Sequence, residues 1–350
     1  MLKIRDKLVD GMLDADAMHL HELLSAPTLF HLKGRRKRPL FVSVLLHGNE
    51  DTGWLAIREI LRKYQVTPLP RSLSLFIGNV EAARENQRRL NGQPDYNRIW
   101  PGAAGIAGLP EAQMMQQVVD EMTQYEIFAS VDIHNNTGIN PHYACVRRMD
   151  NHSLHLATLF SRTVVYFLKP DGVQVEAFAD VCPSVTLECG QPGQEHGTEH
   201  VFDFLDACMH MLELPDHPVA EHDIDVFKTV ATVKVPADLS FGFGQGDADI
   251  RFVDDLDHLN FRELPAETTL GWVRPGSTAR LDVRDDAGEE VGDRYFSMDE
   301  GEIRTILPLM PSMLTANTEA IRQDCLCYLM ERTILSKFSK TNRPVLNSID

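Results

Sequence analysis

The chain has 350 residues, enough to form a large catalytic domain and a smaller second domain. Its formal net charge of −17 at pH 7 argues against nucleic acid and against anionic membranes as partners. No segment approaches the roughly 18 apolar residues of a membrane span, and the first residues lack a signal-peptide pattern. The six cysteines contain no C-x-x-C pair and are interpreted as reduced thiols, so we expect a cytoplasmic protein.

Apolar runs alternate with helical patterns over residues 1–215. Strands are expected at 40–46, 73–77, 127–133, 164–168 and 184–187, and helices near 53–64, 110–124, 151–162 and 198–213. The run at 40–46 is almost entirely apolar, which is typical of a strand covered on both faces. The alternation predicts an α/β catalytic domain over residues 1–215.

Residues 216–335 have a different pattern. From Asp223 the sequence is β-branched, alternating and rich in glycine, which predicts a smaller, mainly β domain. Residues 311–335 return to helical periodicity and predict a terminal helix. Residues 336–350 are polar and are expected to form a loose tail.

Two predicted strands each end on a histidine. His47 follows the first strand, with Glu50 three residues later, and His134 ends the strand at 127–133. A lone histidine at a strand end is more often a hydrogen-bonded structural residue, but two histidines and a glutamate form a set that leaves one zinc coordination position open. We therefore predict one Zn²⁺ per chain, bound by His47, Glu50 and His134.

A third apolar strand ends on Glu188. Burying a carboxylate without a partner is costly, so this glutamate needs either a partner or a chemical role. Proton transfer beside a zinc ion is such a role, and we predict that Glu188 is the general base. The alternative is a structural carboxylate that caps the following turn.

Arginines are concentrated between the two predicted metal-binding segments, at positions 84, 88, 89 and 98. Guanidinium groups can clamp a carboxylate with two hydrogen bonds or stabilise a developing oxyanion, so the cluster suits an anionic ligand. Arg98 lies in a loop between two prolines, directly after Asn97. A solvated helix face is the alternative for Arg84, Arg88 and Arg89.

Two histidines and an aspartate elsewhere in the sequence also have spacings that could serve a metal site. His196 and His200 are four residues apart, the spacing of a metal pair on one helix face, but neither ends a strand, so a solvent-facing or supporting role is favoured. Asp132 stands two residues before His134. We expect it to point away from His134, and so to orient this histidine only if the strand kinks.

Four motifs occur in order along the chain: H-G-N-E at 47–50, G-N-x-x-A followed by arginines and D-Y-N-R at 78–98, D-I-H-N-N-T at 132–137, and T-L-E-C-G-Q at 186–191. Together they resemble the succinylglutamate desuccinylase and aspartoacylase family of zinc-dependent amidohydrolases, which are relatives of the zinc carboxypeptidases. The resemblance implies an α/β fold with a zinc-carboxypeptidase-like mixed sheet flanked by helices, and a smaller carboxy-terminal β domain.

The resemblance also implies roles for individual residues. Carried over by position, His47, Glu50 and His134 are the zinc ligands, Glu188 is the general base, and Asn97 with Arg98 holds the substrate carboxylate. Arg89 is expected to polarise the scissile carbonyl, and Arg88 is expected to bind substrate or to take that polarising role instead. Aspartoacylases place a further arginine about ten residues before the glutamate, where this chain has none, which argues against specificity for aspartate.

The predicted function is zinc-dependent hydrolysis of the amide bond of a small N-acylated amino acid or a similar carboxylate-bearing amide. A metallocarboxypeptidase acting on small peptides would use the same ligands and is the nearest alternative. A non-catalytic zinc-binding protein is the second alternative. The expected partner is a small anionic amide, and a homo-oligomer is compatible with the sequence.

Overall fold

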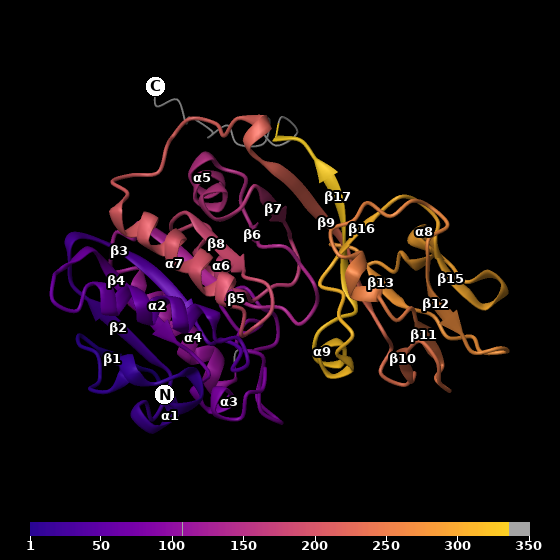
Figure 1. The fold of residues 1–350 in the computed structure, drawn as a ribbon, viewed down its shortest axis with the longest axis horizontal. Coiled ribbons are helices and arrows are strands. Elements are labelled where there is room, and N and C mark those ends of the chain that lie inside the picture. Colours follow the sequence, from indigo (N-terminus) through magenta and orange to yellow (C-terminus); the bar gives the residue numbers. More distant parts are fainter. Residues whose placement is uncertain (107, 336–350) are drawn as a thin grey trace.

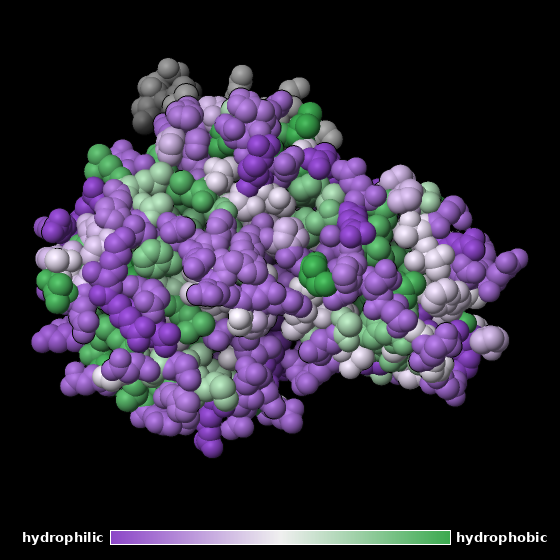
Figure 2. All heavy atoms as spheres, viewed as in Figure 1, coloured by the Kyte–Doolittle hydropathy of each residue, from purple (hydrophilic) through white to green (hydrophobic). Residues whose placement is uncertain are grey.

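The computed structural model describes residues 1–106 and 108–335, whose strands form two sheets of unequal size (Figure 1). The larger has 12 strands and the smaller has five within these residues. Hydrophilic side chains cover most of the face shown in Figure 2, and hydrophobic ones are scattered among them. None of the helices in the described part of the chain is long and apolar enough to cross a bilayer.

The large sheet is mixed, and its centre is parallel. Its main path follows the order β1-β2-β4-β3-β5-β8-β6-β7-β9-β17-β16, with β13 pairing to β9. The bounds are β1 Lys3–Arg5, β2 Thr28–Leu32, β3 Gly34–Val44, β4 Leu69–Ile77, β5 Ala129–His134, β6 Tyr143–Val146, β7 Thr163–Tyr166, β8 Ser184–Glu188, β9 Asp225–Lys234, β13 Asp282–Arg284, β16 Met310–Ser312 and β17 Cys327–Thr333. Strands β4, β3, β5 and β8 run parallel to one another, whereas β6 is antiparallel to β8.

Helices cover both faces of the central strands. One face packs against α2 (Thr52–Lys63), α5 (Asn151–Phe160) and α7 (Glu195–His210), and the other against α4 (Pro110–Met122) and α6 (Gln174–Phe178). The short helices α1 (Leu20–Leu23) and α3 (Val80–Arg84) complete this part. Alternation along β3 explains the two layers: Val42 belongs to the first core and Phe41 to the second. The prediction of a strand buried on both faces is confirmed.

The small sheet has the order β10-β11-β12-β15-β14 and its own core. Its strands are β10 Phe241–Phe243, β11 Ile250–Phe252, β12 Thr269–Val273, β14 Phe296–Ser297 and β15 Glu302–Thr305, with α8 at Gly292–Tyr295. Sequence position 215 does not separate the two sheets, because β9 and β17 extend the large sheet from the carboxy-terminal side. The division of the chain at that residue stays a prediction.

The predicted terminal helix over 311–335 is wrong. Strands β16 and β17 occupy most of the segment, and the helical part is only α9 (Thr318–Gln323), capped by the Asn317 side chain. Helical spacing of apolar residues competes here with pairing of β17 to β9 along seven residues, and the tertiary pairing prevails. The predicted tail at 336–350 lies outside the described residues.

Candidate active site

Three parallel strands of the large sheet end at the same edge, and each delivers a polar side chain there. His47 follows β3, His134 is the last residue of β5, and Glu188 is the last residue of β8. His134 and Glu188 are direct neighbours across the β5–β8 pairing. This is the edge at which open α/β sheets bind ligands.

Glycine at position 48 allows the loop after β3 to lie against the backbone of α3. A Cβ atom there would stand 2.1 Å from the Ala83 backbone nitrogen and 2.2 Å from the Ala82 carbonyl carbon. No side chain fits in that space, so the close approach requires glycine. The loop then carries His47 and Glu50 back toward the end of β5.

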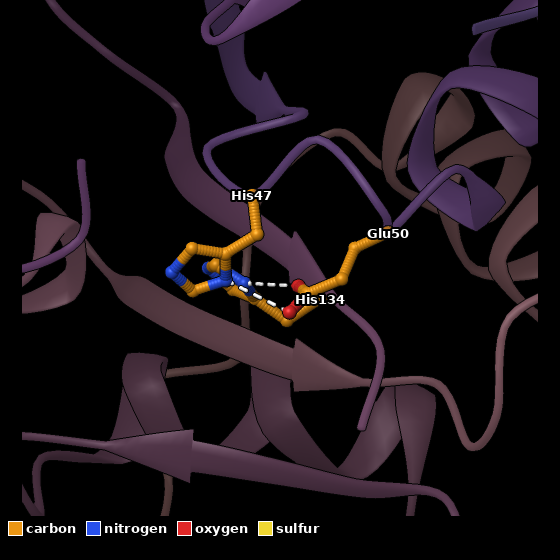
Figure 3. A group of neighbouring side chains, drawn as sticks. All are labelled: His47, Glu50 and His134. Atoms are coloured by element: carbon orange, nitrogen blue, oxygen red, sulfur yellow. Dashed lines mark hydrogen bonds and ion pairs between the residues drawn. The ribbon is translucent and has the colours of Figure 1, made fainter. Parts of the chain in front are cut away.

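His47, Glu50 and His134 converge on one point (Figure 3). The Nδ1 atom of His47 lies 2.8 Å from Oε1 of Glu50, and Nδ1 of His134 lies 2.7 Å from Oε2. One ligand atom from each residue falls within 4.8 Å of the others, and all three side chains are buried. This cluster is the predicted metal-ligand set, and the structure brings all three members together.

The remaining ring nitrogens of both histidines face carboxylates. Nε2 of His47 lies 2.9 Å from Oδ1 of Asp95, and Nε2 of His134 lies 2.7 Å from Oδ2 of Asp132. The Ser43 hydroxyl donates to the other Asp132 oxygen at 2.7 Å. Carboxylate–histidine pairs of this kind orient metal-binding imidazoles and fix which nitrogen is free for the metal.

The expectation that Asp132 points away from His134 is wrong. Residues two apart in a strand lie on the same face, so β5 needs no kink to bring these side chains together. The spacing of two residues between Asp132 and His134 in a strand was therefore sufficient to predict that Asp132 contacts His134. The role of Asp95 was also missed, although it belongs to the D-Y-N-R motif.

The donor set and its electrostatics fit a divalent metal. Burial alone would raise the pKa of Glu50, but the charges of His47 and His134 outweigh burial and lower it below the usual range. Burial lowers the pKa of His134, while Asp132 and Glu50 raise it well above its ordinary value. A buried, ionised carboxylate beside two imidazoles stabilises a positive charge placed between them, and Zn²⁺ would supply that charge.

Glu188 lies beside this cluster in a different environment. Its carboxylate is largely buried, and burial raises its pKa to about 7, against a smaller lowering by His134. The Asn136 side-chain amide donates to Oε2 at 3.4 Å. A carboxyl group with a pKa near neutrality can accept and return a proton, which fits a general base.

The residues around the cluster line a pocket that reaches into both parts of the chain. Its polar wall includes Arg88, Asn97 and Arg98, which places all three predicted substrate-binding residues at the pocket. The Gln174 backbone N–H donates to Oδ1 of Asn97 at 3.0 Å and fixes this amide. Asn97 Nδ2 lies 3.0 Å from Nε2 of His134.

The two pocket arginines already have carboxylate partners. Arg88 donates through Nε and Nη2 to Oδ2 of Asp95, at 3.2 and 3.0 Å. Arg98 donates through Nη2 to both oxygens of Asp324, and Nη2 of Arg88 lies 3.5 Å from the same carboxylate. Asp324 follows α9, far along the chain, and no motif marked it in the sequence.

Arg89 is not where the sequence prediction placed it. Its guanidinium donates to the Gln93 backbone carbonyl at 2.8 Å, and it is not among the described residues that line the pocket. Both arginines lie in a bend after the end of α3 at Arg84, and of the two only Arg88 lines the pocket. The position of Arg89 therefore does not support the carbonyl-polarising role, and Arg88, the alternative for that role, is the better placed of the two.

The competing histidines lie elsewhere. His196 and His200 stack on His142, with ring centroids 5.4 and 4.9 Å from it, and His200 Nε2 lies 2.6 Å from the Phe160 carbonyl oxygen. Among the residues that the structure describes, the metal-type cluster is that of His47, Glu50 and His134.

No family model matches the sequence, and no curated protein matches it. Solved structures do match the fold. The succinylglutamate desuccinylase/aspartoacylase from Rhodobacter sphaeroides has a TM-score of 0.57 at 13% identity, covering 87% of this chain and 88% of its own. The succinylglutamate desuccinylase from Chromobacterium violaceum has a TM-score of 0.54 at 16% identity, with 85% of each chain covered. Murine aminoacylase 3 has a TM-score of 0.55 at 14% identity, covering 86% of this chain and 97% of its own. The chain therefore has the fold of the succinylglutamate desuccinylases and of aminoacylase 3, as its ordered motifs predict.

Proposed function

We propose that the protein is a zinc-dependent deacylase that hydrolyses the amide bond of a small N-acylated amino acid or a similar carboxylate-bearing amide. One observation carries the proposal: a buried His₂Glu cluster lies beside a glutamate whose pKa is about 7, in a pocket that also holds two arginines. The likeness in fold to named deacylases supports it.

His47, Glu50 and His134 would hold one Zn²⁺ through Nδ1, a carboxylate oxygen and Nδ1. When bound there, Zn²⁺ polarises a carbonyl and lowers the pKa of water toward about 7. Asp95 and Asp132 keep the two imidazoles turned toward the ion. Glu188 removes the proton of the attacking water and delivers it to the leaving nitrogen.

Arg88 and Arg98 supply the positive charge of the site. Nη1 of Arg88 lies 3.6 Å from Glu50 Oε1, so this guanidinium stands next to the place where a carbonyl oxygen would gain charge. Arg98 and Asn97 are placed to hold a substrate carboxylate. Arg98 has N–H groups left for this, because Nη1 donates to the Asn97 carbonyl oxygen and Nη2 to Asp324 while Nε remains.

The pocket favours a small substrate over a peptide. Ser312, Met313, Asp324 and Tyr328 line it from the carboxy-terminal part of the chain, and its cavity of about 690 Å³ has the size of a small-molecule site. A metallocarboxypeptidase is therefore the less favoured use of the same ligands.

Hydrolysis assays on zinc-loaded protein test the proposal. The panel holds acetyl, formyl, benzoyl, succinyl and aspartyl amides of common amino acids, together with dipeptides, and release of the free amine is measured. We expect amides to be cleaved, and Glu188→Gln to lose about 10²-fold or more in kcat while it keeps its zinc. Cleavage of dipeptides alone would favour the carboxypeptidase, and a flat panel would overturn the deacylase.

A further inference from the structure

The pocket continues past the metal cluster along one face of the large sheet. In the pairing of β8, β6 and β7, Thr186 of β8 is opposite Cys145 of β6, and Cys145 is opposite Val165 of β7. All three line the pocket, as does Thr229 of β9. The sheet face that carries Glu188 therefore continues as the floor of the pocket across β6, β7 and β9. We call the part of the pocket above Cys145, Val165 and Thr229 the far end, because it lies farthest from the metal ligands along the sheet.

The floor of the far end carries no charged side chain among the described lining residues on β6, β7 and β9. Tyr143 of β6, which is opposite Glu188, belongs to the same floor, and its hydroxyl donates to the sulfur of Met313 at 3.0 Å. Phe167 and Met313 also line this end of the pocket. Burial raises the pKa of the Tyr143 hydroxyl and of the Cys145 thiol well above their ordinary values, so both stay neutral. Val165 and Tyr143 also belong to a buried apolar cluster that continues along the sheet to Phe227, the residue opposite Val165 on β9.

One charged side chain reaches this end among the described lining residues, and it is already paired. Lys169 forms an ion pair with Asp171, and its side chain is 45% exposed. The other lining charges, including Arg88, Arg98 and Asp324, are gathered around the metal cluster. A carboxylate placed on the floor would lose its hydration without gaining a cation, which is strongly unfavourable.

On the proposed deacylase function we propose that this far end binds an uncharged, mainly apolar group of the substrate. The substrate class is then an N-acyl amino acid with one carboxylate, held near Arg98, and one apolar group of about the size of a short aliphatic chain or a phenyl ring, held over Cys145 and Val165. A second carboxylate, as in succinyl or aspartyl compounds, is rejected.

The apolar group can belong to the acyl part or to the amino-acid side chain, and two series of substrates distinguish these sources. The first series keeps one amino acid and varies the acyl group from acetyl to butyryl, benzoyl and succinyl. The second keeps acetyl and varies the amino acid from alanine to leucine, phenylalanine and aspartate. In one series we expect kcat/KM to rise by about 10-fold or more with apolar size and to fall by at least as much for the acidic member.

Phe167 offers a variant that tests the wall itself. Phe167→Ala should bring the kcat/KM of the larger apolar substrate close to that of acetylalanine in the same variant. Leu168→Ala is the matched control, because Leu168 is the exposed next residue and does not line the pocket. The ratio of two substrates within one variant cancels any general loss of folded protein.

Product binding tests the far end separately from catalysis. Calorimetry on the zinc-loaded protein compares benzoate with succinate, and phenylalanine with aspartate. Tighter binding of one apolar member, lost in Phe167→Ala, supports the proposal even if no amide is cleaved, in which case only the deacylase fails. Preference for the acidic members in turnover or in binding, or equal behaviour of all members, would overturn the apolar subsite.

Discussion

One nitrogen of Arg98, Nη2, donates to both carboxylate oxygens of Asp324, at 2.9 and 3.0 Å. The side chains are 26% and 21% exposed, so the pair is partly buried but still in contact with solvent. Burial would raise the pKa of Asp324, but Arg98 and Arg88 hold it below the ordinary value. The arginine proposed to bind the substrate carboxylate therefore already holds a carboxylate of the chain, with which a substrate must compete.

Asp324→Asn should strengthen the binding of anionic substrates. Asparagine keeps an oxygen that accepts from Arg98, so the guanidinium stays in place, but its charge is no longer neutralised. We expect KM for carboxylate substrates to fall about 10-fold, equivalent to about 1.4 kcal/mol. Steady-state kinetics on an acylated amino acid and on its neutral amide analogue check this, because the analogue should gain little.

Glu319→Gln is the control for Asp324→Asn, since it removes the same charge from an exposed position on α9 and should leave KM unchanged. A higher KM in Asp324→Asn for both the acid and its amide would instead make Asp324 a positioning residue for Arg98.

The protein should bind one zinc per chain, and His47 and His134 should be required for it. Each histidine supplies one of three ligand atoms, and loss of one leaves a two-ligand site that binds weakly. Elemental analysis of His47→Ala and His134→Ala after dialysis should find little zinc, while His196→Ala and His200→Ala should retain it. Full zinc content in the His47→Ala, His134→Ala double variant would place the metal elsewhere.

Asp132→Asn should weaken zinc binding without removing a ligand. The amide that replaces one carboxylate oxygen no longer fixes the His134 ring, and loss of such partners typically lowers metal affinity 10–100-fold. Competition with a chelator of known affinity measures this change. Ser43→Ala serves as the comparison, because it removes the other Asp132 hydrogen bond and keeps the carboxylate. Equal losses in both variants would reduce Asp132 to a packing role.

Glu188 should make the stability of the metal-free protein depend on pH. Its pKa is raised from 4.5 to about 7 in the folded state, so between these values the folded state binds more protons than the unfolded state. Its contribution to the free energy of unfolding therefore falls as pH rises, by about 3 kcal/mol across the window. Urea unfolding between about pH 5 and pH 8 should show this fall in wild type relative to Glu188→Gln.

Glu199→Gln is the control for the pH experiment, since Glu199 is exposed on α7. It should follow the wild-type curve throughout. Parallel curves for wild type and Glu188→Gln would contradict a raised pKa at Glu188.

The metal cluster and Glu188 could be predicted because these residues follow apolar strands in three short motifs. Each of His47, His134 and Glu188 marks the end of a strand, and parallel strands end at one edge, so local patterns were sufficient. Asp132 could have been assigned by the same period-two rule. Arg88 and Arg89 could not be distinguished, because the direction of adjacent side chains depends on the turn that follows α3.

Asp324 and the apolar far end were beyond sequence reasoning for a different reason. Asp324 is 226 residues from Arg98, and Thr229 reaches the pocket only because β9 pairs with β7. The predicted helix over 311–335 failed through the same long-range pairing, since β17 forms on β9. Contacts between segments that are far apart in the chain produce no local hydrophobic periodicity, so the sequence pattern cannot predict them.

The placement of the small sheet between β9 and β17 limits how the two parts of the protein can move. Its chain leaves the large sheet through β9 and returns through β16 and β17, which are adjacent strands of that sheet (Figure 1). A module joined by a single linker can rotate freely, whereas one anchored by two hydrogen-bonded strands is doubly tethered. Met313 and Asp324 lie in the segment between β16 and β17, so this wall of the pocket is held in register by the large sheet itself and would stay in place if the small sheet moved.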